Sequence, residues 1–254
     1  CKHAGWSISI LASPSGAPAW LRRRIVPLHE RGLARAVRSV ATPARNIIVS
    51  SPRSTERPML TPAASRRLHS TTTVSTVAEL TAAVANASIG RILLVAGTYA
   101  FSSGTACTAS YDPSALCISR NVSLEALEPG TVVLNAQGTS SRYRRVLCIS
   151  AGTVDVIGLN ITGGYVSAGG GGMYITGSAT VIITGTNIYS NQVTGFPPLD
   201  GGGISINGGT VSIIDTNIYS NQADGYGGGV EVECSTGDVT FDKCEIHSNT
   251  ADTG

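Results

Sequence analysis

Apolar residues recur in a fixed pattern from residue 154 onward: one residue, a second two positions on, and a third five further along. Successive copies are 27, 30 and 28 residues apart (154 to 181, 181 to 211, 211 to 239). The positions are Val154, Val156, Ile161; Val181, Ile183, Ile188; Val211, Ile213, Ile218; and Val239, Phe241, Ile246. Alternation with period two, bounded by Gly, Asn and Asp, is typical of short strands joined by turns. The pattern therefore predicts an all-β repeat whose units are each too small to bury their own apolar face.

A glycine run precedes each later copy, at 170–172, 201–203 and 227–229, and a short alternating strand follows each run. A unit of about 28 residues with two or three short strands does not fit a helical repeat. The simplest architecture is a parallel β-helix, in which equivalent strands stack about 4.8 Å apart. We expect Ile161, Ile188, Ile218 and Ile246 to form one interior column.

One phrase, Thr-Asn-Ile-Tyr-Ser-Asn-Gln, occurs at 186–192 and again at 216–222, and a looser copy occurs at 244–250. Its second asparagine, Asn191, Asn221 or Asn249, comes three residues after the interior isoleucine, where the coil must turn. Asn tolerates left-handed backbone and hydrogen-bonds the backbone of tight turns. We predict a structural asparagine ladder along the helix, with a ligand site built from these side chains as the alternative.

The triple glycine followed by an alternating Ile or Val strand, with Ile-x-x-Asn further on, resembles the paired GGA[Ile/Leu/Val] and Phe-x-x-Asn motifs of polymorphic outer-membrane-protein repeats. Here Gly replaces the Ala, and Ile188, Ile218 or Ile246 replaces the Phe. The resemblance covers residues 122–254. That family belongs to the right-handed β-helix, or pectin-lyase-like, class, so the resemblance implies a right-handed solenoid and an adhesin-type role at a cell surface.

Residues 76–79, Thr-Val-Ala-Glu, form a capping box, because a Thr hydroxyl and a Glu three residues on can each accept a backbone N–H. Val77, Leu80 and Val84 follow at helical spacing, and a buried strand is predicted at 91–95. We expect this helix to plug the open end of the solenoid. The order of helix and strand also resembles the structural N-terminal cap of pectin-lyase-like proteins.

Residues 1–72 have a different composition. Residues 1–70 hold 12 of the 18 Lys and Arg but only Glu30 and Glu56 as acids, which gives +10 against −8 for the rest. Frequent Pro, Ser and Arg predict a disordered leader. An organelle transit segment or a polyanion-binding tail are the alternatives, although no nucleic-acid-binding fold accompanies the arginines. The β-helix is expected over 73–254, cut off at its C-terminal end, with no membrane-spanning helix.

Six cysteines suggest two disulfides, Cys107–Cys117 and Cys234–Cys244, each joining residues ten apart. Neither spacing is that of a metal-binding pair, and the histidines do not cluster, so we expect neither zinc nor any other cofactor. Three Asn-x-Ser/Thr triplets are compatible with secretion. We therefore expect an extracellular or cell-surface protein.

Function on a β-helix would appear as an aligned column of outward side chains. Tyr189, Tyr219 and His247 form such a column, which could hold a sugar ring or could simply stabilise neighbouring coils. Asp200, Asp224 and Asp252 lie in turns, where acids on adjacent coils could share Ca²⁺. Solvated turn residues are the plainer interpretation of these acids.

Catalysis on acidic polysaccharides would need a base near clustered acids, or paired carboxylates. Asp215 and Asp242, 27 residues apart at near-equivalent positions, are the candidates for such a pair. No other polar residue converges on them in the sequence. We therefore expect a non-enzymatic adhesion or glycan-binding scaffold, with a polysaccharide lyase or glycoside hydrolase as the alternative.

Overall fold

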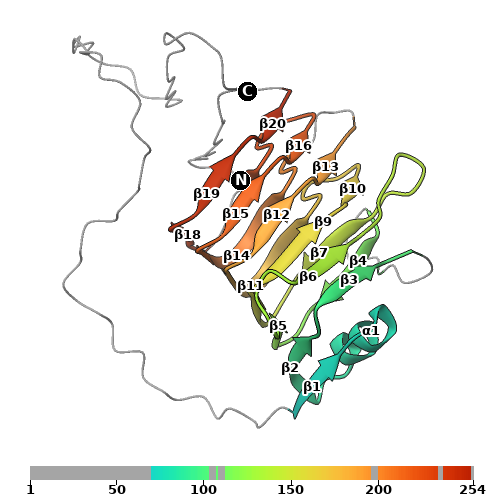
Figure 1. The fold of residues 1–254 in the computed structure, drawn as a ribbon. Helices are drawn as coiled ribbons and strands as arrows, with labels where there is room; N and C mark the ends of the chain where they lie inside the picture. The colour runs from blue at the N-terminus through green and yellow to red at the C-terminus, as the bar shows by residue number, and fades with distance from the viewer. Residues whose placement is uncertain (1–69, 103–106, 108–111, 196–199, 234–236, 253–254) are drawn as a thin grey trace, which may run out of the picture.

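The computed structural model describes residues 70–102, 107, 112–195, 200–233 and 237–252. These residues form a solenoid of parallel strands closed at one end by a helix (Figure 1). The predicted all-β parallel β-helix is thereby confirmed. The repeats in the sequence correspond to successive coils, because Val181 lies in register with Val154 in the preceding coil and with Val211 in the next.

Three sheets run along the solenoid, each made of equivalent strands from successive coils. The ten-stranded sheet contains β1 (Ser70–Val74), β2 (Ile89–Leu94), β4 (Ser114–Ile118), β5 (Val122–Ala126), β7 (Arg145–Ile149), β8 (Thr153–Ile157), β11 (Met173–Thr184), β14 (Ile204–Ile214), β17 (Val230–Val232) and β18 (Val239–Asp242). The six-stranded sheet contains β3 (Gly97–Ala100), β6 (Val132–Asn135), β9 (Leu159–Thr162), β12 (Asn187–Tyr189), β15 (Asn217–Tyr219) and β19 (Glu245–His247). The four-stranded sheet contains β10 (Tyr165–Val166), β13 (Gln192–Val193), β16 (Gln222–Ala223) and β20 (Thr250–Ala251).

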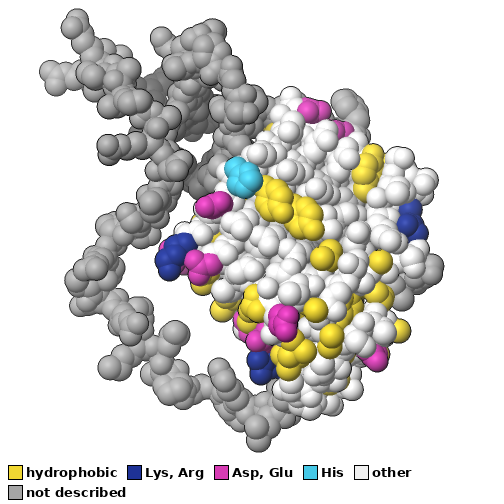
Figure 2. All heavy atoms as spheres, in the orientation of Figure 1, with side chains coloured by type: hydrophobic (Ala, Val, Ile, Leu, Met, Phe, Trp, Pro, Cys, Tyr) yellow, Lys and Arg dark blue, Asp and Glu magenta, His cyan; other side chains and the backbone are white. Residues whose placement is uncertain are grey.

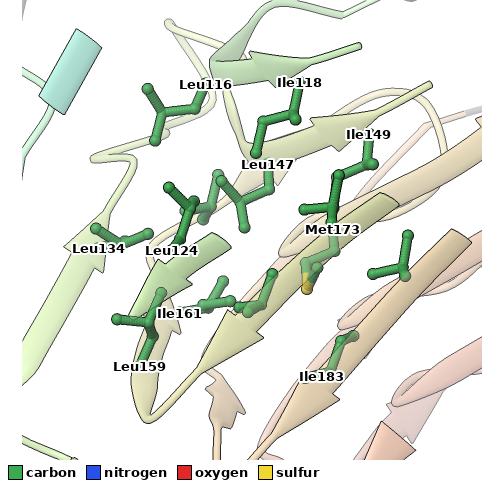
Figure 3. Packing of buried hydrophobic residues seen from close by; sticks show 14 of the residues in the cluster. Leu116, Ile118, Leu124, Leu134, Leu147, Ile149, Leu159, Ile161, Met173 and Ile183 are labelled. Carbon is green, nitrogen blue, oxygen red and sulfur yellow. The ribbon is translucent and has the colours of Figure 1, made fainter. Parts of the chain in front are cut away.

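The interior is a narrow column of aliphatic side chains (Figure 3). Ile188 pairs with Ile161 below and Ile218 above, and Ile218 pairs with Ile246. Ile161, Ile188 and Ile218 are fully buried, and Ile246 packs against them. The expected interior column is therefore confirmed, because alternation in a strand sends every second side chain to the core.

The glycine runs stack on one another where the chain re-enters the ten-stranded sheet. A Cβ atom added at Gly203 would lie 2.5 Å from the carbonyl oxygen of Gly229 and 2.9 Å from Nδ2 of Asn221. Such contacts leave no room for a side chain, so the repeat requires glycine there for close backbone approach.

Helix α1 (Val77–Ala85) begins with the predicted capping box: Thr76 accepts from the Glu79 amide, and the Glu79 carboxylate accepts from the Thr76 amide. Its buried face, Leu80, Ala83 and Val84, covers the end of the core. Strand β1 begins at Ser70, ahead of the boundary expected at residue 73, because Ser70–Val74 pairs with β2. The rest of the predicted leader lies outside the described residues.

Candidate functional site

The three asparagines of the repeated phrase lie one above another at the corner between the six-stranded and four-stranded sheets. Asn221 Oδ1 accepts from the backbone N–H of Asn191 and from its Nδ2, both at 3.1 Å. Asn249 Oδ1 accepts from the same two groups of Asn221, both at 3.0 Å. All three side chains are buried, so they stabilise the turns from inside and offer no surface to a ligand.

Each asparagine follows a residue in a strained backbone conformation. The residues just before them, Ser190, Ser220 and Ser248, have φ values of 52°, 54° and 55°, a left-handed conformation that costs L-residues energy. Nδ2 of Asn191 donates to the Tyr189 carbonyl at 3.1 Å and thereby ties the corner down.

The outer face of β12, β15 and β19 carries the aromatic column predicted from the sequence. Tyr189 and Tyr219 stack with ring centroids 5.1 Å apart and an interplanar angle of 7°. Tyr219 and His247 stack at 5.3 Å and 6°. Because the rings cover one another's faces, they present their edges and polar atoms to solvent. Burial, with the neighbouring Tyr219, raises the pKa of Tyr189, so this phenol stays neutral.

A second column, which the sequence analysis did not identify, runs beside the rings on the same strands. Asn187 Nδ2 donates to Asn160 Oδ1 at 2.9 Å, and Asn217 Nδ2 donates to Asn187 Oδ1 at 2.9 Å. The repeated Asn-Ile-Tyr triplet contained the signal, since residues on either side of an inward Ile must both point outward.

We call the outward positions of β9, β12, β15 and β19 the Asn/Tyr face. Figure 2 shows this side of the molecule, with the imidazole in cyan beside hydrophobic side chains in yellow. The four strands contain no Lys or Arg and one acid, Glu245. The face is therefore polar and aromatic with little charge, and its chemistry repeats from coil to coil.

The proposed carboxylate pair, Asp215 and Asp242, lies at an exposed corner of adjacent coils. The Asp215 amide donates to the Asp242 carbonyl at 2.9 Å, and Asp215 adopts a left-handed φ of 47°. The equivalent corner residue in the next coil is Lys243, with φ 52°. Asp215 thus occupies a conserved turn geometry within the repeat, and among the described residues no further acid is gathered around this pair.

The acids considered for Ca²⁺ are separated by the fold. Asp224 Oδ2 accepts from the Thr194 hydroxyl at 2.8 Å and from the Gly195 amide at 3.0 Å, which holds two adjacent loops together. Asp252 is exposed beyond β20. Only Asp200 joins an acidic cluster.

That cluster consists of Asp200, Glu231 and Glu233, and their nearest carboxylate oxygens all lie within 4.8 Å of one another. Ser205 donates to Glu231 at 3.3 Å, and Asn207 donates to Glu233 at 2.5 Å. Three carboxylates at this spacing could share a divalent cation, which prefers oxygen ligands. The alternating Val-Glu-Val-Glu of 230–233 places both glutamates on one outward face, but only the fold brings Asp200 to them.

Glu231 is 5% exposed, although it carries an ionisable group. Burial, together with the neighbouring Glu233 and Asp200, raises its pKa to about 8. The side chain therefore binds a proton near neutral pH, as expected where carboxyl groups crowd together out of water.

The structure contains the predicted Cys107–Cys117 disulfide, with Cα atoms 5.9 Å apart. Cys234 lies outside the described residues, and Cys244 carries a free thiol whose Sγ is 3.2 Å from the Ile213 carbonyl oxygen. Cys244 occupies the position of Thr186 and Thr216, whose hydroxyls contact the carbonyls of Thr184 and Ile214. The structure thus gives Cys244 a place in the repeat and does not support a Cys234–Cys244 bond.

A shallow hollow of about 360 Å³ lies at the capped end, between β1 and α1. Its one acid, Glu79, is already engaged in the capping box. Within the described part of the chain, no helix has the length and apolar character needed to cross a bilayer.

Comparison with known proteins agrees with this geometry. The family described as "Right handed beta helix region" matches residues 107–254, which is more than half of the chain. No curated protein and no solved structure matches the chain. The stacked parallel coils and the family match together show that the chain belongs to the right-handed β-helix family.

Proposed function

We propose that this chain is a non-enzymatic repeat scaffold of a secreted or cell-surface protein, and that it binds glycans through the Asn/Tyr face. The observation that carries the proposal is the pairing of two aligned columns on the outer side of one sheet, amides beside aromatic edges, half-buried in β12 and β15 and exposed in β19. Sugars are recognised largely by hydrogen bonds to their hydroxyls, and this face offers amide groups and the polar edges of the stacked rings from β12 to β19.

The charge of the face narrows the ligand class. With no Lys or Arg in β9, β12, β15 or β19 and with Glu245 at one end, the face has no cation to pair with a carboxylate or sulfate. A neutral oligosaccharide therefore fits it better than an acidic one. The Cys107–Cys117 disulfide supports an oxidising compartment, which agrees with a secreted or cell-surface location.

A glycan array probed with the full chain tests the proposal, followed by titration of any bound oligosaccharide against variants. We expect Tyr219→Phe, which removes one outward hydroxyl and keeps the stack, to weaken binding by roughly tenfold, the effect of about 1.4 kcal/mol. The matched control is Tyr226→Phe, because Tyr226 is exposed on a loop away from the face. Equal binding by both variants and by wild type would remove the Asn/Tyr face from the proposal.

A second candidate function rests on the acidic cluster. A protonated Glu231 beside two carboxylates is the arrangement that a glycoside hydrolase uses for general acid catalysis. The near-complete burial of Glu231 weighs against it, since a glycosidic oxygen must reach the acid. Depolymerisation of acidic or neutral polysaccharides by wild type, lost in Glu231→Gln and kept in Tyr219→Phe, would favour this candidate over the scaffold.

A further inference from the structure

A third cysteine lies next to the disulfide in a neighbouring coil. Cys117 in β4 pairs in register with Cys148 in β7, and both strands run parallel. In-register neighbours of adjacent parallel strands lie about 4.8 Å apart, which is within the Cα separation that a disulfide spans. The present bond joins Cys117 to Cys107, whose Cα is 5.9 Å away.

Cys117 and Cys148 also point to the same side of the sheet. Leu116, Ile118, Leu147 and Ile149 project into the core (Figure 3). Because successive side chains of a strand alternate, the cysteine between each pair of these residues faces outward. The two sulfur atoms therefore lie on the same face of the sheet, on adjacent hydrogen-bonded strands.

Cys148 is fully buried with a free thiol, whereas Cys107 is only partly buried. A reagent in solution cannot reach Cys148, whereas the strand register places the Cys107–Cys117 disulfide on the adjacent rung. Burial raises the pKa of the Cys148 thiol, and the Arg145 guanidinium partly opposes that shift. The thiol is thus mostly protonated at neutral pH and becomes more nucleophilic as the pH rises.

We propose that Cys107, Cys117 and Cys148 form an intramolecular thiol–disulfide exchange site. The Cys148 thiolate attacks Sγ of Cys117, the Cys117–Cys148 bond forms and the Cys107–Cys117 bond breaks. Cys107 leaves as a thiolate and takes up the proton that Cys148 lost. One disulfide and one thiol are present before and after, so the step needs no oxidant or reductant.

The exchange changes what the disulfide does. The Cys107–Cys117 bond closes a loop of ten residues, whereas a Cys117–Cys148 bond would link two successive coils. It would also move the free thiol from a buried position to the partly exposed Cys107, where it can attack a disulfide of another molecule, forming a mixed disulfide and releasing one thiol.

Disulfide mapping of the intact folded chain tests the proposal. The protein is incubated at pH 7, 8 and 9 with iodoacetamide, quenched in acid, digested with pepsin and analysed by mass spectrometry. We expect a Cys117–Cys148 linked peptide and alkylated Cys107, both appearing roughly tenfold faster per pH unit and independently of protein concentration. Only Cys107–Cys117 linked peptide at all three pH values, with Cys107 never alkylated, would overturn the proposal.

Two variants separate the exchange from general scrambling. Cys148→Ser should abolish alkylation of Cys107, whereas Cys244→Ser, which removes the other free thiol of the described residues, should leave it unchanged. Equal alkylation of Cys107 in wild type and Cys148→Ser would contradict the assigned attacking group. As an independent measure, Cys107→Ser treated with oxidised glutathione should give the Cys117–Cys148 bond, and a persistent glutathione adduct on Cys117 would oppose the proposal.

Discussion

The capped half and the repeated half of this solenoid are held together in different ways. Around the cap, single arginines reach across the chain to backbone carbonyls: Arg120 donates to Ala83 and Val84 at 2.8 Å, at the C-terminal end of α1. In the coils from β12 onward, identical side chains bond one another from rung to rung, as Asn191 and Asn221 do. The first half therefore depends on contacts that occur once, and the second on contacts that the repeat copies.

This difference has a physical basis. A helix end leaves carbonyls without intrahelical partners, and a cation satisfies several of them together with the helix dipole. Successive coils with the same sequence place the same side chains in register. An asparagine amide can therefore donate to the equivalent asparagine in one neighbouring coil and accept from that in the other. The repeated half gains a regular outer surface from this, which is why the Asn/Tyr face lies there.

The largest expected effect concerns the unique contacts. Arg145 is fully buried, with Nε 2.7 Å from the Gly170 carbonyl oxygen, Nη2 2.6 Å from that of Gly169, and its guanidinium 4.9 Å from the ring of Tyr174. Arg145→Ala should lower the free energy of unfolding by about 3–5 kcal/mol, because buried carbonyls lose their donor and a cavity forms. Urea unfolding followed by circular dichroism measures it, and a loss below about 1 kcal/mol would contradict the role given to this contact.

Removing one side chain from the buried asparagine ladder should lower the free energy of unfolding somewhat less than removing Arg145. Asn221→Ala leaves the Asn191 amide and the Ile188 carbonyl without their partner, and we expect a loss of about 2–4 kcal/mol in urea unfolding. Asn217→Ala, in the half-exposed outer column, is the matched control and should cost about 1 kcal/mol or less. Equal losses of unfolding free energy for the two variants would show that the buried ladder stabilises the fold no more than the outer asparagine column does.

Glu231 is a buried ionisable group within the repeated half, and stability should depend on pH through it. Its folded pKa of about 8 lies above the ordinary value of 4.5, so the folded state holds the proton more tightly than the unfolded chain. The contribution of Glu231 to the free energy of unfolding is then greatest below about pH 4.5. It falls as the pH rises toward 8, by at most about 1.4 kcal/mol per pH unit.

Unfolding of wild type and Glu231→Gln at pH 5, 6.5 and 8 measures that slope. The glutamine keeps a hydrogen-bonding side chain of similar size and cannot ionise, so the difference between the two proteins should grow with pH. A difference that stays constant across the three values would show that Glu231 ionises without cost in the folded state.

The smallest effect is expected on the outer ring column. Tyr219→Ala removes the middle ring, which stacks on Tyr189 and on His247, and should cost about 0.5–1.5 kcal/mol. Tyr219→Phe keeps both stacks and should leave the urea midpoint unchanged. A loss from Tyr219→Phe as large as that from Tyr219→Ala would assign the stabilisation to the hydroxyl rather than to stacking.

The sequence predicted most of the repeated half because its signals are local. Period-two alternation identified the interior isoleucines, and the distance from Ile188 to Asn191 placed the asparagine at a corner. The aligned phrase also placed Cys244 at the position of Thr186 and Thr216, where its thiol contacts a backbone carbonyl as their hydroxyls do. The ten-residue spacing to Cys234 had instead suggested a disulfide. The acidic cluster was missed because Asp200 reaches Glu231 and Glu233 only through the fold of a loop, and no spacing rule relates a loop residue to the next coil.

The measurement that tests the Asn/Tyr face most directly is hydroxyl-radical footprinting of the full chain with and without an oligosaccharide selected on the array. Tyr189, Tyr219 and His247 should be protected from oxidation when the glycan is bound, while Tyr226, whose amide donates to Asp200 beside the acidic cluster, should react as before. Protection of Tyr226 with unchanged reactivity at Tyr189 and Tyr219 would contradict the account and move the binding site to the acidic cluster.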